Sequence, residues 1–221
     1  MIRQLRRTAV GLVAAGTMLA GLSACATPAY TYATDNADQA YFKVPSGWPQ
    51  ADPLDVSRVQ QVLGITPSGT GGSFTWVRAY ETATHPSRVA LLISRTPVVY
   101  ASVENLKTDL RNALNFNTMR DLIFPVTPAD RQLAAKAGVN LPGFTVLASS
   151  TITTKDGVRG INEEYGFLVG GVQPVLFDQT VLTNSSTTKL YLLLVRCDEQ
   201  CFSAHLAQIK TVVQSFTVRG S

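Results

Sequence analysis

The chain has 221 residues, of which 45% are hydrophobic and 15% charged, and its 19 lysines and arginines barely exceed its 15 acidic residues. Three of the arginines lie in the first 24 residues, which contain no acid, so 16 basic and 15 acidic residues remain beyond that point. This near balance gives no reason to expect a nucleic acid or an acidic membrane surface as a partner.

The first 24 residues have the pattern of an export signal. Arg3, Arg6 and Arg7 precede an uncharged, apolar run at residues 9–22. That run is shorter than the roughly 20 residues that a membrane-spanning helix needs. A basic segment followed by a short apolar one is typical of a signal peptide. We therefore expect residues 1–24 to be cleaved from the mature protein.

The leader ends in Leu22-Ser23-Ala24-Cys25, which resembles the lipobox of bacterial lipoprotein precursors. The resemblance implies a diacylglyceryl group on the sulfur of Cys25 and, after cleavage, an acyl group on its amine. Two acyl chains give stable anchoring, because each buried CH₂ contributes about 0.8 kcal/mol. We expect a protein that is anchored by lipid to the extracytoplasmic side of the cell membrane and does not span it. An ordinary signal peptide with an incidental cysteine is the alternative.

The rest of the chain is long enough for one domain with a sizeable core. Residues 26–40 are small, polar and aperiodic. We expect residues 25–40 to comprise the lipidated cysteine and a flexible tether, and residues 41–221 to form a single domain.

The first half of that domain has mixed signals. Strands are predicted at residues 40–44, 73–80 and 88–96, because these runs are rich in β-branched and aromatic residues. A helix is predicted at residues 53–64, with Gly64 as its stop signal.

Two further helices are predicted before the middle of the chain. The first is expected to start with Ser102 as its N-cap and to run to residue 115. Its apolar stripe comprises Val103, Leu106, Leu110, Ala113 and Leu114. The second has Thr127 as its cap, Pro128 at its first position and Gly138 as its terminator.

The C-terminal half is dominated by predicted hairpins. The expected strands are residues 144–154, 158–169, 174–183 and 189–197. Asp156-Gly157 is the turn of the first hairpin, and a polar turn at residues 184–188 closes the second. The unbroken apolar run "LYLLLV" indicates a strand that is buried on both faces.

A last helix is predicted at residues 202–216. Its buried stripe is expected to comprise Leu206, Ile209, Val213 and Phe216. Successive hairpins with helices before and after them indicate an α+β fold, in which helices cover an antiparallel sheet.

The stretch "YFKVPSGW" resembles the Phe-x-x-Pro-x-Gly-Trp opening of PsbP-like proteins and of actinobacterial lipoproteins of the LpqN type. The ending, an antiparallel meander followed by a helix and "VVQSFTV", resembles theirs as well. Together the resemblance covers residues 40–218. It implies an α/β/α sandwich around a mainly antiparallel sheet of six or seven strands. It also implies a module that binds proteins or metal clusters and is not an enzyme, although no shared motif marks metal-binding residues here.

The stretch "RCDEQCFSAH" spaces Cys197, Cys201 and His205 evenly. Disulfides persist outside the cytoplasm, and Cys25 is assigned to lipid, so the other two cysteines are predicted to form a structural disulfide. A metal site would need a fourth ligand, and the only other histidine is His85. A redox pair would favour a spacing one residue shorter. Free thiols and a metal site remain as alternatives.

The sequence contains little that indicates catalysis or a cofactor. Gly69, Gly71 and Gly72 lie in "PSGTGGSF", but a phosphate loop would continue into a helix and this segment continues into a strand. We therefore expect this segment to be a loop. For the protein as a whole we expect no cofactor and no metal site.

Carboxylates are the remaining candidates for chemistry. Glu163 and Glu164 are adjacent in a predicted strand, so they should point to opposite faces. Asp178 lies in the middle of another strand, where an outward, half-exposed position is the preferred interpretation. If Asp178 is buried, its pKa should rise and it needs a hydrogen-bond partner.

The expected function is that of a non-enzymatic cell-envelope lipoprotein, whose domain binds an envelope protein or a small ligand outside the membrane. The alternative is a carboxylate-based hydrolase of the envelope, built around Asp178 or Glu163.

Overall fold

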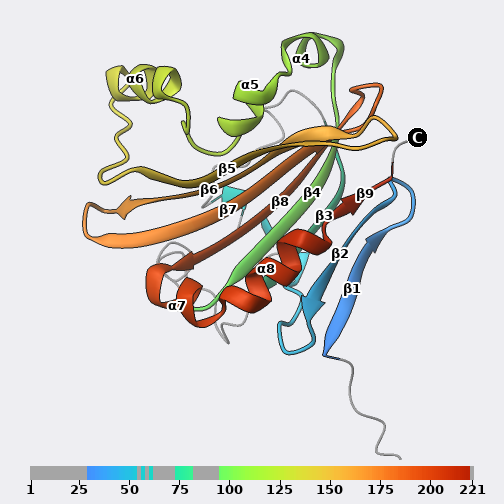
Figure 1. Ribbon diagram of the computed structural model, residues 1–221, viewed down its shortest axis with the longest axis horizontal. Coiled ribbons are helices and arrows are strands. Elements are labelled where there is room, and N and C mark those ends of the chain that lie inside the picture. The colour runs from blue at the N-terminus through green and yellow to red at the C-terminus, as the bar shows by residue number, and fades with distance from the viewer. Residues whose placement is uncertain (1–28, 54–55, 58–59, 62–72, 82–94, 220–221) are drawn as a thin grey trace, which may run out of the picture.

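The computed structural model describes residues 29–53, 56–57, 60–61, 73–81 and 95–219. The main sheet consists of β3 (Ser73–Glu81), β4 (Val98–Asn105), β5 (Thr145–Thr153), β6 (Arg159–Val169), β7 (Gln173–Thr183) and β8 (Lys189–Asp198). Its order is β3-β4-β8-β7-β6-β5 and every pairing is antiparallel (Figure 1). With helices on both sides, this arrangement confirms the predicted α+β sandwich.

A smaller sheet lies against one face of the main sheet. It consists of β1 (Tyr30–Asp35), β2 (Ala40–Pro45) and β9 (Thr217–Val218), in the order β1-β2-β9. The flexible tether predicted for residues 25–40 is therefore wrong over its second part, because β1 pairs with β2 along its whole length. Only Ala33 of β1 is buried, so the strand has no apolar alternation that the sequence could reveal.

Two consecutive helices, α7 (Glu199–Ala204) and α8 (Leu206–Ser215), lie on the same side of the main sheet as β1 and β2. The single helix predicted for residues 202–216 is thus divided at His205, which changes the phase of its buried stripe. Ile209 and Phe216 are buried as predicted, whereas Leu206 is 39% exposed and Val212 takes its place in the core.

The other face of the main sheet carries α4 (Thr108–Ala113), α5 (Phe116–Arg120) and α6 (Pro128–Lys136) (Figure 1). The predicted caps of α6 are confirmed: the hydroxyl of Thr127 accepts a hydrogen bond from the backbone N–H of Asp130, and Gly138 has a φ of +83°. None of the described helices is long and apolar enough to cross a membrane.

The helix predicted to begin at Ser102 is wrong in its first half. Residues 98–105 form β4, which pairs with β3 on one side and β8 on the other, and the helix begins only at Thr108. Val103 and Leu106 are buried, but their spacing of three fits a helical stripe as well as a strand that runs into a turn. Pairing with two neighbouring strands therefore decides the structure here, against the local pattern.

Both predicted C-terminal hairpins are confirmed. Gly157 adopts the left-handed φ of +84° that the Asp-Gly turn requires. β8 is buried on both faces, as its apolar run predicted. Trp48, just beyond the end of β2, is also buried. The predicted strand at residues 88–96 falls mostly outside the described residues, as do Cys25, His85 and the glycine-rich segment at residues 69–72.

Candidate functional site

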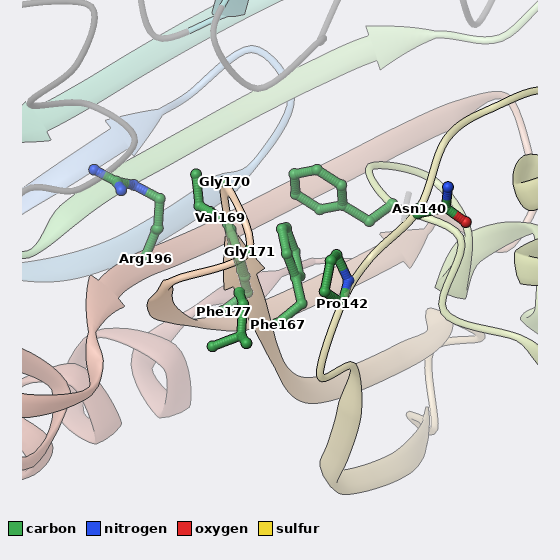
Figure 2. Close-up of a pocket in the computed structure, with 10 residues that line it drawn as sticks. Asn140, Pro142, Phe167, Val169, Gly170, Gly171, Phe177 and Arg196 are labelled. Carbon is green, nitrogen blue, oxygen red and sulfur yellow. The ribbon is translucent and has the colours of Figure 1, made fainter.

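A pocket of about 360 Å³ opens on the face of the main sheet that carries α5 and α6 (Figure 2). Its lining comprises Phe124, Asn140, Pro142, Phe167, Leu168, Val169, Gly170, Gly171, Phe177 and Arg196. These residues come from two loops, the turn between β6 and β7, and the strands β6, β7 and β8. The sheet therefore supplies the rigid floor of the pocket, and loops supply its walls.

Three phenyl rings form much of the apolar part of the lining. Phe167 and Phe177 stack with their centroids 5.3 Å apart, across β6 and β7. Phe124, from the loop after α5, approaches both at 5.0 Å. Strand alternation places Phe167 and Phe177 on the same face of the sheet, so the loop that carries Phe124 can close over them.

Arg196 lies at one end of the pocket, and Asn140 lies at the other (Figure 2). Arg196 is only 2% exposed and stands beside Phe177 in the register of β7 and β8. Burial lowers the pKa of its guanidinium to about 10, against the opposing effect of Glu81 and Asp198. The group is still charged at neutral pH, so a mostly apolar pocket has a cation at its end. In the sequence, the one charged residue in the apolar stretch "LLLVRC" indicates this buried cation.

Glu163 lies on the same face as the pocket but does not line it. Its side chain is 1% exposed, and its Oε1 accepts from Arg120 Nε at 2.5 Å and from the Ser149 hydroxyl at 2.6 Å. The carboxylate thus fastens the end of α5 to the sheet.

Gln179 provides a second attachment for α5. It is fully buried, and its Nε2 donates to the carbonyl oxygens of Met119 and Arg120 at 3.0 and 3.1 Å. Its Oε1 accepts from the hydroxyl of Tyr165 at 3.0 Å. Its amide nitrogen holds the helix and its amide oxygen is paired with β6, so its role is structural.

Asp178 lies on the opposite face and is only 6% exposed, so the predicted outward, half-exposed position is wrong. Burial raises the pKa of its carboxyl to about 6. Asn162 Nδ2 donates to it at 2.6 Å and opposes that rise, whereas Glu164, its direct neighbour on β6, adds to it. The hydrogen-bond partner that a buried carboxyl needs is therefore present.

The two carboxylates of the hydrolase hypothesis do not meet. Asp178 shares a face with Glu164, and strand alternation places Glu163 on the other side of the sheet. A general acid and base would have to converge on one pocket. The described residues hold no group of three or more histidine, cysteine, aspartate or glutamate side chains that could bind a metal ion.

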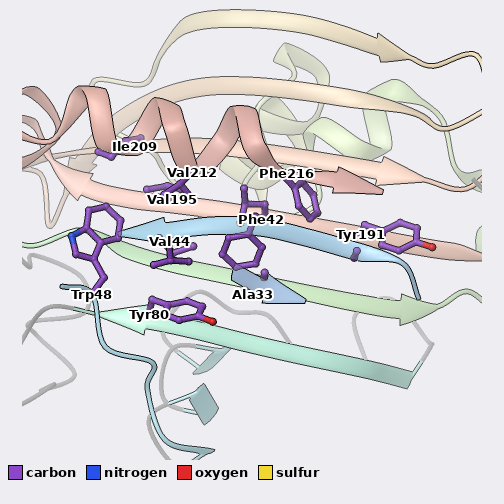
Figure 3. Packing of buried hydrophobic residues seen from close by; sticks show 14 of the residues in the cluster. Ala33, Phe42, Val44, Trp48, Tyr80, Tyr191, Val195, Ile209, Val212 and Phe216 are labelled. Carbon is purple, nitrogen blue, oxygen red and sulfur yellow. The ribbon is translucent and has the colours of Figure 1, made fainter. Parts of the chain in front are cut away.

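The face opposite the pocket is filled by aromatic packing around Phe42 of β2 (Figure 3). Its ring lies edge-on to Trp76, Tyr80 and Phe216, with centroids 5.9 to 6.3 Å apart. Through this core, β2 packs against the main sheet and the end of α8.

Cys197 and Cys201 also belong to that face. Their Cα atoms are 5.6 Å apart, within the range for a disulfide, and the structure places their sulfur atoms at bonding distance. Asp198 caps α7 by accepting from the backbone N–H of Cys201 at 2.7 Å. His205 instead places its Nδ1 2.7 Å from Gln208 Oε1. The structure thus brings together the two cysteines and leaves the histidine paired elsewhere.

No protein-family model and no curated protein sequence matches the chain. Among solved structures, cyanobacterial PsbP (CyanoP) from Synechocystis sp. PCC 6803 is similar, with a TM-score of 0.52 and 16% identity over 90% of this chain and 98% of that one. LpqN of Mycobacterium tuberculosis, described as involved in cell envelope biogenesis, has a TM-score of 0.48 and 12% identity over 81% and 83% of the two chains. The Saccharomyces cerevisiae Ran-binding protein Mog1p has a TM-score of 0.44 and 10% identity over 86% of this chain and 96% of that one. The likeness to the cyanobacterial protein shows that this chain has the PsbP-like fold.

Proposed function

We propose that this protein is a lipid-anchored component of the cell envelope, in which the PsbP-like domain is a non-catalytic binding module. The observation that carries the proposal is the composition of the pocket. Its walls are mainly phenyl rings, other apolar side chains and backbone, and Arg196 is the one ionisable residue among the described residues that line it. Such a pocket can bind an apolar molecule and orient it by a single charge, but its lining holds no second ionisable group with which Arg196 could carry out acid–base chemistry.

The envelope location rests on the leader and on Cys25. The basic segment, the short apolar run and the small residues before the cysteine support lipidation and an extracytoplasmic domain. The close pairing of Cys197 and Cys201 is consistent with an oxidising compartment.

The hydrolase alternative keeps one observation in its favour, which is the pKa of about 6 at Asp178. A carboxyl of that pKa can exchange a proton near neutral pH. However, Asp178 lies across the sheet from both the pocket and Glu163. We therefore favour the binding module.

Replacing Cys25 with serine should abolish lipidation and release the protein from the membrane fraction, because no thioether can form at that position. Fractionation of cells grown with a labelled fatty-acid precursor measures both effects. A Cys197→Ser/Cys201→Ser variant, which keeps Cys25, should stay labelled and sediment with membranes. A Cys25→Ser protein that still sediments and carries label would refute the anchor.

Replacing Val169 with tryptophan should fill the mouth of the pocket and exclude its ligand, since Val169 lines the pocket and is half-buried. Protein purified from its own envelope in mild detergent can be analysed by native mass spectrometry for small molecules that remain bound. We expect a bound apolar molecule in the wild type and its loss in the variant. Gln214→Trp, on the exposed side of α8, is the matched control. Equal retention by all three proteins would contradict a binding role for the pocket.

A further inference from the structure

β5 is the outer strand of the main sheet at the end opposite β3 (Figure 1). Among the described residues only β6 pairs with it. Every residue of β5 except Ile152 is exposed, and the apolar side chains of Val146 and Leu147 are 43% and 51% exposed.

The sequence of β5 carries few of the features that normally protect an edge strand. Natural edges are blocked by charged side chains, prolines, bulges or short length. The nine residues "TVLASSTIT" include no charge, no proline and no glycine. A single bulge lies between Val146 and Ala148, and residues 148–153 continue in regular register. Alternate N–H and C=O groups of such a strand point outward, away from β6.

We propose that β5 is a dimerisation edge, which pairs antiparallel with β5 of a second copy of this chain. The pairing would join two six-stranded sheets into one continuous sheet about a two-fold axis perpendicular to it. Each outward donor on one copy then meets an outward acceptor on the other.

The absence of charge favours a second copy as the occupant. A two-fold axis places a strand against itself, so any charged residue near its middle would face the same charge, which destabilises the pair. β5 is neutral throughout, whereas the opposite edge, β3, carries Arg78 and Glu81. Pairing over the whole strand puts Ser149, its midpoint, opposite Ser149 of the second copy. The same register sets the exposed Val146 opposite the partly buried Ile152, so two apolar side chains meet across the interface.

The location of the N-terminal sheet agrees with this symmetry. A two-fold axis perpendicular to the main sheet leaves corresponding faces of the two copies on the same side. The face that carries β1 and β2 would therefore point the same way in both, and both anchors could enter one membrane. This argument about the membrane rests on the proposed lipid anchor. The arguments from charge and from hydrogen bonding are independent of it.

Cysteine substitutions along β5 test the pairing in the full chain, exported in its own cells. We expect Ser149→Cys, or Ser150→Cys if the bulge shifts the register by one, to form a disulfide-linked dimer on a non-reducing gel. Facing Cα atoms in an antiparallel pair are about 4.5–5.5 Å apart, which suits a disulfide. Thr145→Cys and Thr153→Cys should give about tenfold less dimer, because each would lie roughly 27 Å from its own copy at about 3.4 Å per residue.

A second variant distinguishes pairing from random collision. Leu147→Lys should reduce the dimer formed by Ser149→Cys about tenfold, since a charged side chain on an edge strand blocks the addition of a further strand. Leu206→Lys, on α8 and away from β5, should leave the dimer unchanged. Equal cross-linking at Thr145, Ser149 and Thr153, or none at any of them, would overturn the proposal. A cross-link from Ser149→Cys to a protein of another mass would assign the edge to a different partner and overturn it as well. The same cross-links are measured in a Cys25→Ser background, which removes the only other thiol able to cross-link if Cys25 is not lipidated.

Discussion

Replacing Arg120 with leucine should lower the free energy of unfolding by about 3 kcal/mol, because it leaves a buried carboxylate without its cation. Glu163 is 1% exposed, and its Oε1 lies 2.5 Å from Arg120 Nε. After the substitution the Ser149 hydroxyl still donates a hydrogen bond to that carboxylate. Urea denaturation at pH 7 measures the loss.

A double variant separates the charge from the packing of the arginine stem. In the Arg120→Leu background, Glu163→Gln should recover part of the lost stability, because a neutral amide has a smaller desolvation cost than a carboxylate. The two substitutions should therefore be clearly non-additive in a double-mutant cycle. A loss below about 1 kcal/mol for Arg120→Leu, which is typical of exposed pairs, would show that the pair does not hold α5 to the sheet.

Replacing Asp178 with asparagine should stabilise the protein at pH 8 by up to about 3 kcal/mol and change it little at pH 4. The carboxyl has a pKa of about 6 when folded, against 3.8 for the ordinary side chain. The folded state therefore binds the proton more tightly, and the wild type loses stability as the pH rises from about 4 to about 6. Above that range the cost of burying the charge is fully present, and the asparagine variant avoids it. Thermal unfolding of both proteins between pH 4 and pH 8 measures the difference.

Glu164→Gln is the matched control for that experiment. Glu164 faces Asp178 across β6 and β7 and raises the pKa of its carboxyl. Removing the neighbouring charge should lower that pKa, which an NMR titration of the Asp178 carboxyl records directly. A stability difference between wild type and Asp178→Asn that is the same at pH 4 and pH 8 would contradict the burial argument.

The hairpins were predictable because their signals are local. The Asp156-Gly157 turn and the apolar run of β8 each determine structure within about ten residues. The helix predicted from Ser102 failed because the spacing of Val103 and Leu106 does not distinguish a helix from a strand. Here the outcome depends on β3 and β8, which lie far away in the sequence.

The candidate site was less predictable for the same reason. Phe124, Phe167 and Phe177 come from one loop and two strands, so no short pattern could bring them together. The burial of Asp178 likewise depends on what packs over β7. Arg196 is the exception, since a charged residue in an otherwise apolar strand marks a position where burial and charge coincide.

The early start of β1 limits the distance between the domain and a lipid anchor at Cys25. Only residues 26–29 separate Cys25 from Tyr30. Fully extended, that segment reaches at most about 18 Å, which is less than the thickness of a bilayer's hydrocarbon core. With Cys25 held in the membrane, the domain would lie close to the lipid headgroups and could not reach partners farther from the membrane. Its partner or ligand would have to be delivered to the membrane surface.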